Sequence, residues 1–165
     1  YVRNTMSNVV KQVAQDILFA EIRSMLSQGS QVQLRVRGRS MRPMLEHERD
    51  LVTLEHEPAH CYRRGDIVLA STSDQRWVLH RIVRCDKLKC TLQGDGNVGQ
   101  QEECQRVDII GRVVSFQRKT RQFSVDHWIW QIYANVWQTL VYLRRPLLLA
   151  YELLHHMSIR ISSFK

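Results

Sequence analysis

The feature that most constrains the fold is a series of short apolar segments between residues 31 and 117, each bounded by glycine or polar residues. The first segment, 31–37, alternates: Val32, Leu34 and Val36 share one face, and polar residues take the other. A period of two is typical of a half-buried strand. Many short strands separated by turns indicate a mainly β domain that ends near residue 117.

Further segments of the same region have strand character. They are 50–54, 65–70, 77–83, 88–92 and 107–116. A polar loop with Pro58 follows the first of these, and Gly94–Asn97 predicts a sharp turn.

Helical periodicity precedes and follows this region. From about Asn4 to Gln28, apolar residues recur at helical spacing with charged residues between them, which predicts an amphipathic helix that ends at Gly29. Its charges exclude a membrane span, which needs about 20 mostly apolar residues. The expected division of the chain is an N-terminal helix (1–30), a β domain (31–117) and a helical tail (118–165).

The tail combines aromatic residues with positive charge. From residue 118 onward there are seven Lys or Arg against Asp126 and Glu152, so the tail carries +5 of the net charge of +8. Pro146 predicts a break between two helices. Tryptophans beside arginines fit an interfacial membrane helix, and they equally fit helices packed on the domain or on a second subunit. Peripheral membrane contact and oligomers both stay open, and the expected location is the cytoplasm or the cytoplasmic face of the membrane.

The four cysteines do not match a metal-binding pattern. There is no Cys-x-x-Cys pair, and the spacing from Cys85 to Cys90 is unusual for zinc, although His60 is next to Cys61. The chain is not a small disulfide-dense scaffold and shows no secretory signal at its start. We therefore expect mostly free thiols in a reducing compartment, with no metal and no cofactor.

The candidate chemistry lies at Gly38–Leu45. Gly38 lets the backbone leave the preceding strand in a conformation that other residues avoid, and Pro43 fixes φ three residues after Ser40. Ser40 is thereby placed on a tight turn at a strand end. It either caps a short helical turn or acts as a nucleophile, and the second role needs a base from elsewhere in the chain.

His80 and Asp95 are the candidate partners of Ser40. His80 lies in an apolar strand, where its ring is either a hydrogen-bonded structural residue or a general base held by packing. Asp95 lies in a glycine-flanked turn, where its carboxylate either bonds its own backbone or orients the imidazole. Each residue alone is a weak signal, and their order with Ser40 strengthens it.

Five blocks of sequence, in order, resemble the serine peptidases of the signal peptidase and LexA-type class. They are Ser40-Met41-x-Pro43, Gly65-Asp66-Ile67-Val68, His80-Arg81-Ile82, Gly94-Asp95-x-Asn97 and Ile110-Gly111-Arg112-Val113. The histidine makes the chain most similar to the archaeal and endoplasmic-reticulum signal peptidases, since bacterial leader peptidases and LexA-like proteins use a lysine base.

The resemblance implies a LexA/signal-peptidase-like β fold with Ser40 as nucleophile and His80 as base. It also implies an oxyanion hole that includes the Ser40 backbone N–H, with Gly38 and Met41 as supporting residues. Gly38 lacks the hydroxyl that many bacterial members use there.

Two further departures from the family pattern affect the site and its surroundings. Gln100 and Gln101 stand where an acidic pair usually follows the Gly-Asp-x-Asn turn, so the third catalytic residue is Asp95, Glu102 or Glu103. A charged amphipathic helix also stands where signal peptidases have a membrane span.

The sequence thus predicts a serine endopeptidase that cleaves leader or precursor peptides, bound in extended form along a sheet edge. One alternative is a catalytically inactive peptide-binding module, prompted by Gln100 and Gln101. The other is a LexA-type DNA-associated regulator, which the positive charge would suit. No helix-turn-helix of the usual short kind precedes the β domain, so nucleic acid is not an expected partner.

Overall fold

The computed structural model describes the backbone of residues 2–140 and 143–162 and the side chains of residues 14–140 and 143–154. In chain order the elements are α1 (Val2–Ser27), β1 (Val32–Arg35), β2 (Asp50–Glu55), β3 (Ile67–Ser71), β4 (Trp77–Cys85), β5 (Lys89–Gln93), β6 (Glu102–Gln105), a 3₁₀ helix (Arg106–Asp108), β7 (Ile109–Arg118), β8 (Arg121–Ser124), α2 (Trp128–Thr139) and α3 (Arg144–Ser162).

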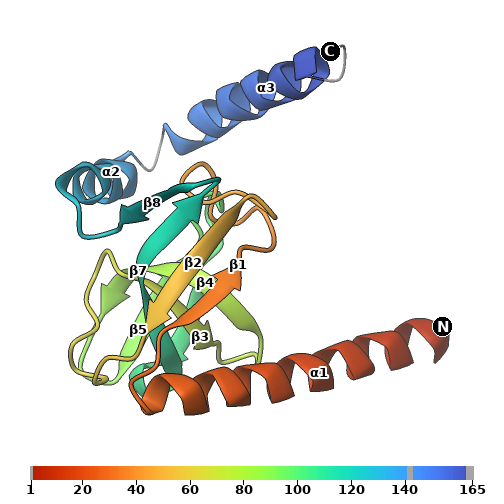
Figure 1. The fold of residues 1–165 in the computed structure, drawn as a ribbon, viewed down its shortest axis with the longest axis vertical. Coiled ribbons are helices and arrows are strands. Elements are labelled where there is room, and N and C mark those ends of the chain that lie inside the picture. Colours follow the sequence, from red (N-terminus) through yellow and green to blue (C-terminus); the bar gives the residue numbers. More distant parts are fainter. Residues whose placement is uncertain (1, 141–142, 163–165) are drawn as a thin grey trace.

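The strands form one antiparallel sheet that curls into a half-barrel (Figure 1). Seven of them follow the order β1-β2-β7-β3-β4-β5-β6, and β8 pairs with β7 outside this path. The first residues of β7 pair with β3, and its last residues lie between β2 and β8. The prediction of a mainly β domain is confirmed.

The core includes the loop that carries Ser40. Met41, Met44 and Leu45 from this loop are buried in the main hydrophobic cluster beside residues of β2 and β7 such as Val52 and Phe116. Burying three large side chains removes apolar surface from water and anchors the loop to the sheet. The loop is therefore a fixed part of the domain.

The predicted N-terminal helix is confirmed as α1. It ends at Ser27, and Gly29 follows in a left-handed conformation at φ 81°, where the Ser30 N–H donates to the Met25 carbonyl at 3.1 Å. Ile22 and Leu26 in its last turns are buried against the sheet, while its N-terminal end extends past the sheet (Figure 1).

The C-terminal region differs from the prediction in two ways. Residues 121–124 form β8, so the sheet continues beyond residue 117, where the β domain was expected to close. The predicted helix break at Pro146 is wrong: α2 ends at Thr139, and Pro146 lies in the first turn of α3. The first turn tolerates proline because its N–H groups have no partner within the helix.

The cysteines also differ in part from the prediction. Cys85 and Cys90 are directly opposite on β4 and β5 and form a disulfide, so the expectation of free thiols is wrong for this pair. Cys61 and Cys104 are free. Burial raises the pKa of the Cys104 thiol to about 11, so this side chain is a neutral core residue.

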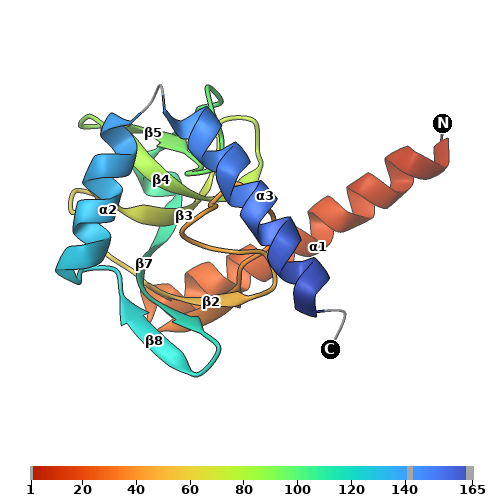
Figure 2. The ribbon, with the colours of Figure 1, turned by 90° about the horizontal axis from the view of Figure 1, so that it is seen from above.

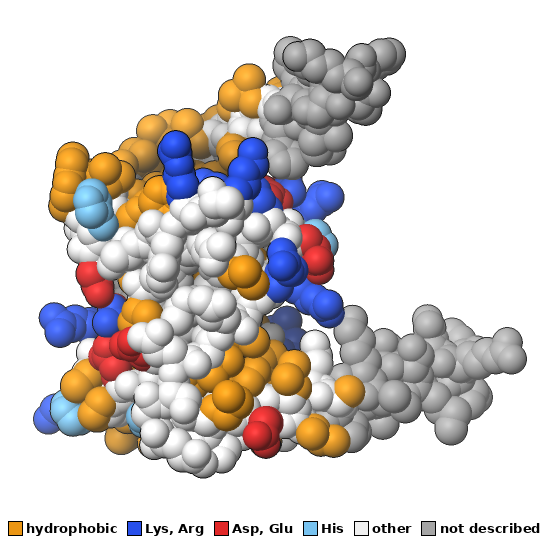
Figure 3. Space-filling model, viewed as in Figure 1, with side chains coloured by type: hydrophobic (Ala, Val, Ile, Leu, Met, Phe, Trp, Pro, Cys, Tyr) orange, Lys and Arg blue, Asp and Glu red, His pale blue; other side chains and the backbone are white. Residues whose placement is uncertain are grey.

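Helix α2 has two apolar faces. Trp130, Tyr133 and Trp137 face the sheet, and the Trp130 ring meets the Phe116 ring edge-on with the centroids 5.0 Å apart. The opposite face contributes to the hydrophobic surface at the upper left of Figure 3. Among the described residues, no helix is long and apolar enough to cross a membrane.

Helix α1 offers a test of this packing. Leu26 is fully buried, so Leu26→Ala should lower the free energy of unfolding by about 2–5 kcal/mol through lost burial and the cavity left behind. The matched control, Leu18→Ala, changes a residue of the same helix that is 51% exposed and should cost about 0.5 kcal/mol or less. Urea unfolding measures both, and equal losses would contradict the packing of α1 on the sheet.

Candidate active site

Ser40 is half-buried in the loop between β1 and β2. Gly38 takes a left-handed conformation at φ 92°, as the sequence predicts, and its N–H donates to His47 Nδ1 at 3.0 Å. After Ser40 the chain makes one helical turn, closed by the Leu45 N–H on the Met41 carbonyl at 2.9 Å. Ser40 therefore lies on a tight turn whose following residues belong to the core.

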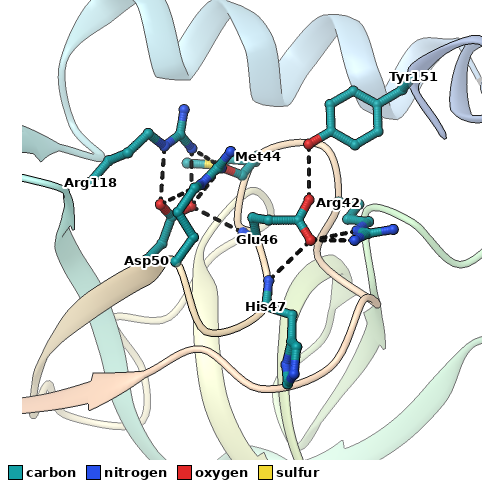
Figure 4. Close-up of polar contacts among 8 residues, drawn as sticks. Arg42, Met44, Glu46, His47, Asp50, Arg118 and Tyr151 are labelled. Atoms are coloured by element: carbon teal, nitrogen blue, oxygen red, sulfur yellow. Dashed lines mark hydrogen bonds and ion pairs between the residues drawn. The ribbon is translucent and has the colours of Figure 1, made fainter. Parts of the chain in front are cut away.

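A buried carboxylate, that of Asp50, contacts this loop on one side (Figure 4). Asp50 accepts hydrogen bonds from Arg49, from Arg118 and from the Glu46 N–H, and Arg118 also donates to the Met44 carbonyl at 2.7 Å. Burial alone raises the pKa of Asp50, but the two arginines outweigh it and hold the pKa below its ordinary value. The charged network ties the loop to the end of β7.

Helix α3 reaches the same loop from the other side. Tyr151 donates its hydroxyl to Glu46 Oε2 at 2.9 Å, and the other oxygen of Glu46 bonds Arg42 and accepts from the His47 N–H (Figure 4). Glu152 Oε1 lies 3.9 Å from Arg42 Nη1. The C-terminal helix thus contacts the residues that immediately follow Ser40.

The Gly94–Asn97 turn packs directly behind Ser40. The Gly96 N–H donates to the Ser40 carbonyl at 2.7 Å. A Cβ on Gly94 would collide with the Ser40 backbone, and one on Gly96 would lie 2.8 Å from the Arg39 carbonyl. Any side chain at either position would displace Ser40, so the two glycines set how closely the turn approaches the serine.

Ser40 and His80 line the same cavity, which has a volume of about 120 Å³. One wall is the segment from Val36 to Met41, and the other is β4 from Trp77 to His80. Gly38 and Met41, the predicted supporting residues, both lie in this wall. The side chains of Ser40 and His80 do not hydrogen-bond each other in the described structure, a common state for catalytic pairs without substrate.

The carboxylate that contacts His80 belongs to Glu102. Its Oε2 lies 3.1 Å from His80 Nδ1, and both side chains are almost fully buried. Gln100 donates to the other oxygen, Oε1, at 3.2 Å. Gln100, one of the two glutamines at the place of the expected acidic pair, thus bonds the carboxylate that contacts His80.

Burial lowers the pKa of His80 below its ordinary value of 6.5, and the charge of Glu102 and its hydrogen bond only partly offset this effect. His80 is therefore neutral at pH 7 and can accept a proton. With Nδ1 directed at Glu102, Nε2 is the ring nitrogen left for that proton.

Asp95 does not make the contact that the sequence suggested for it. Its two oxygens accept from Arg81 Nε at 2.8 Å and from Arg81 Nη2 at 2.7 Å. His80 and Arg81 are consecutive in β4, so their side chains point to opposite faces of the strand. The Asp95 carboxylate is thus bonded to Arg81, while the carboxylate bonded to the His80 ring is that of Glu102.

Helix α2 holds the other side of Asp95. Trp137 donates its indole N–H to the Asp95 carbonyl at 2.8 Å, and the Tyr133 hydroxyl lies 3.4 Å from Oδ2. Arg144, at the start of α3, donates to the Trp137 carbonyl at 2.9 Å. Two helices therefore fix the turn that supports Ser40.

The contact of Glu102 could not be singled out from sequence because β6 was not predicted. The alternation of β6 is visible only in the folded sheet, because three of the four residues in 102–105 are polar. Glu102 and Cys104 are buried, while Glu103 and Gln105 are exposed, a period of two that a half-buried strand requires. Glu102 lies on the buried face of β6 together with Cys104, whereas Glu103, the other candidate for the third site residue, lies on the exposed face.

The site combines a serine and a histidine that line one cavity with a carboxylate on Nδ1 of the histidine ring. This set of side chains is the one found in serine hydrolases, carried here on a curled antiparallel sheet.

A family model described as peptidase S24-like matches residues 6–114, which is more than half of the chain. The protein belongs to this family. Ser40, His80 and Glu102 lie inside the matched region, whereas α2 and α3 follow it. Among curated proteins, none matches the sequence.

The contact between His80 and Glu102 can be tested by titration. Glu102→Gln keeps the shape but removes the charge that raises the pKa of His80, so this pKa should move further below 6.5. Histidine NMR signals followed against pH measure the change, with the His80 signal assigned by its loss in His80→Gln. The control is Glu103→Gln, whose carboxylate is largely exposed near Lys89 and which should leave the titration unchanged. Identical titrations in the two variants would contradict the contact.

Proposed function

We propose that this protein is a signal-peptidase-like serine endopeptidase that cleaves leader or precursor peptides. The observation that carries the proposal is the shared cavity of Ser40 and His80, with Glu102 on Nδ1 of the ring. Membership of the peptidase S24-like family supports it. In this proposal Glu102 takes the place that the sequence alone left open among three acids.

The proposed reaction uses each group in turn. Ser40 Oγ attacks the peptide carbonyl while His80 Nε2 takes its proton, and Glu102 stabilises the imidazolium through Nδ1–H. The Ser40 backbone N–H contributes to the oxyanion hole. His80 then protonates the leaving amine, and water hydrolyses the acyl-enzyme by the same route.

The substrate is proposed to bind as an added strand. In the described sheet, β4 pairs with β3 along Trp77–Arg81 but with β5 only from Arg81 onward. The second edge of Trp77–His80 therefore faces the cavity and the Val36–Ser40 segment. An extended peptide laid in this gap could bond β4 through its backbone and place its scissile carbonyl near Ser40.

A second cavity favours a substrate that continues past Ser40. It has a volume of about 150 Å³ and lies between Ser40, the Gly96–Asn97 turn and residues Leu148 and Tyr151 of α3. Ser40 therefore borders two cavities, and a substrate that continues past the cleaved bond could occupy the second one. Because α3 forms one wall, residues beyond the cleaved bond would meet a part of the protein that lies outside the family match.

A serine-directed fluorophosphonate probe tests the nucleophile. Wild-type protein should be labelled at Ser40, as mapped by mass spectrometry, and Ser40→Ala should abolish the label. His80→Ala should slow labelling by about 10²-fold or more because the serine loses its base. Ser30→Ala is the matched control and should label normally. A folded wild-type protein that takes no label at Ser40 would contradict the proposal and favour a peptide-binding module without catalysis.

The pH dependence tests the base. Only neutral His80 can accept the proton, and its pKa lies below 6.5, so the acid limb of Ser40 labelling should have its midpoint below pH 6.5. In Glu102→Gln the midpoint of the acid limb should move to lower pH. The pH-independent rate of Ser40 labelling, reached at higher pH, should drop by about 10²-fold or more. Glu103→Gln should match wild type. An acid limb whose midpoint lies above pH 7, or whose midpoint is the same in Glu102→Gln, would rule out this assignment of the base.

A further inference from the structure

Helices α2 and α3 both present large apolar side chains to solvent. We call this surface the outer face; it includes Trp128, Ile129, Ile132, Leu149, Leu153 and Leu154, each at least 48% exposed. Figure 2 looks down on the side of the molecule that carries these helices and the β7–β8 hairpin. From this face we propose that the protein docks on an anionic lipid surface.

Packing within the molecule does not account for the outer face. The opposite side of α2 already covers the sheet through Trp130, Ala134 and Trp137, and α3 contacts the domain through Arg144 and Tyr151. Helix α2 also has no charged residue along its whole length. Exposing so many large apolar side chains on two neighbouring helices is rare in a protein whose surface meets only water.

Exposed cations accompany this face. Lys119 and Arg121 lie at the β7–β8 turn, Arg145 is in the first turn of α3, and Arg39 lines a cavity beside Leu148 and Tyr151. None of these four side chains forms an ion pair with an acid among the described residues. The β7–β8 hairpin ends on the side of the molecule that carries α2 and α3 (Figures 1 and 2).

The charge distribution favours lipid over a second copy of the chain. In a two-fold dimer the same face comes from both subunits, so the interface would bring together two copies of the same set of cations. A bilayer with anionic headgroups instead offers negative charge at the level of the cations and hydrocarbon beneath the apolar side chains. Exposed tryptophan beside basic residues is the composition that prefers this interface. Because α3 also contacts the Ser40 loop, docking would hold the candidate site close to the lipid surface.

Vesicle co-sedimentation of the full chain tests the proposal. The protein should pellet with vesicles of phosphatidylcholine and phosphatidylglycerol, and at least tenfold less with phosphatidylcholine alone. Ile132→Glu/Leu149→Glu places one carboxylate on each helix and should weaken binding to the anionic vesicles at least tenfold. The matched control is Leu88→Glu on the β4–β5 turn, a leucine that is 77% exposed and lies outside the face, and it should bind as wild type does.

A second variant separates charge from apolar contact. Lys119→Glu/Arg121→Glu keeps the outer face and should lower the preference for phosphatidylglycerol, as should raising the salt concentration, which screens exposed charges. All substituted residues are exposed, so thermal unfolding should stay within a few degrees of wild type.

Three results would overturn lipid docking. One is that wild-type protein pellets with no vesicle. Another is that Ile132→Glu/Leu149→Glu binds as well as the Leu88→Glu control. The third is that wild-type protein forms a dimer in solution that Ile132→Glu/Leu149→Glu dissociates, which would assign the face to a second copy. These readouts do not depend on Ser40 chemistry, so the peptidase proposal and the docking proposal fail separately.

Discussion

The buried ion pair of Arg81 and Asp95 is the interaction on which the site depends. Both side chains are 3% exposed and joined by two hydrogen bonds, and Arg81 also donates to the Gly65 carbonyl at 2.8 Å. Removing one partner of such a pair leaves an uncompensated buried charge, which costs about 3–5 kcal/mol. The pair fixes the Gly94–Asn97 turn to β4, and through that turn it sets where Ser40 lies relative to His80.

Two sets of contacts hold the Ser40 loop in place. The first is the Asp50–Arg118 pair, which binds the Ser40 loop to β7 while the apolar residues of the loop enter the core. The second is the Gly94–Asn97 turn, in which Gly94 and Gly96 approach the Ser40 backbone more closely than any other residue type allows. Helices α2 and α3, which lie beyond the family match, add contacts to both sets through Trp137 and Tyr151. The site is therefore assembled from segments that are far apart in the sequence.

The accuracy of the sequence predictions follows from how each element is stabilised. Strands with long alternating or apolar runs, such as β2 and β4, and the amphipathic helix α1 were predicted because local periodicity reflects their burial. β6 and β8 have four residues each, and β8 is largely exposed, so too little periodicity was available. Pro146 predicts a helix break because the sequence around it does not show that this proline belongs to the first turn of a helix.

By itself, the sequence determined a mainly β domain with a leading helix, the placement of Ser40 on a glycine-led turn and of His80 in a strand, and the resemblance that joins them. Only the tertiary structure decided which acid meets the imidazole. Asp95 and Glu102 both follow His80 within 22 residues, and no local pattern ranks them. The choice came from the alternation of β4, which directs His80 and Arg81 to opposite faces, and from the pairing of β6 with β5, which brings Glu102 to the ring.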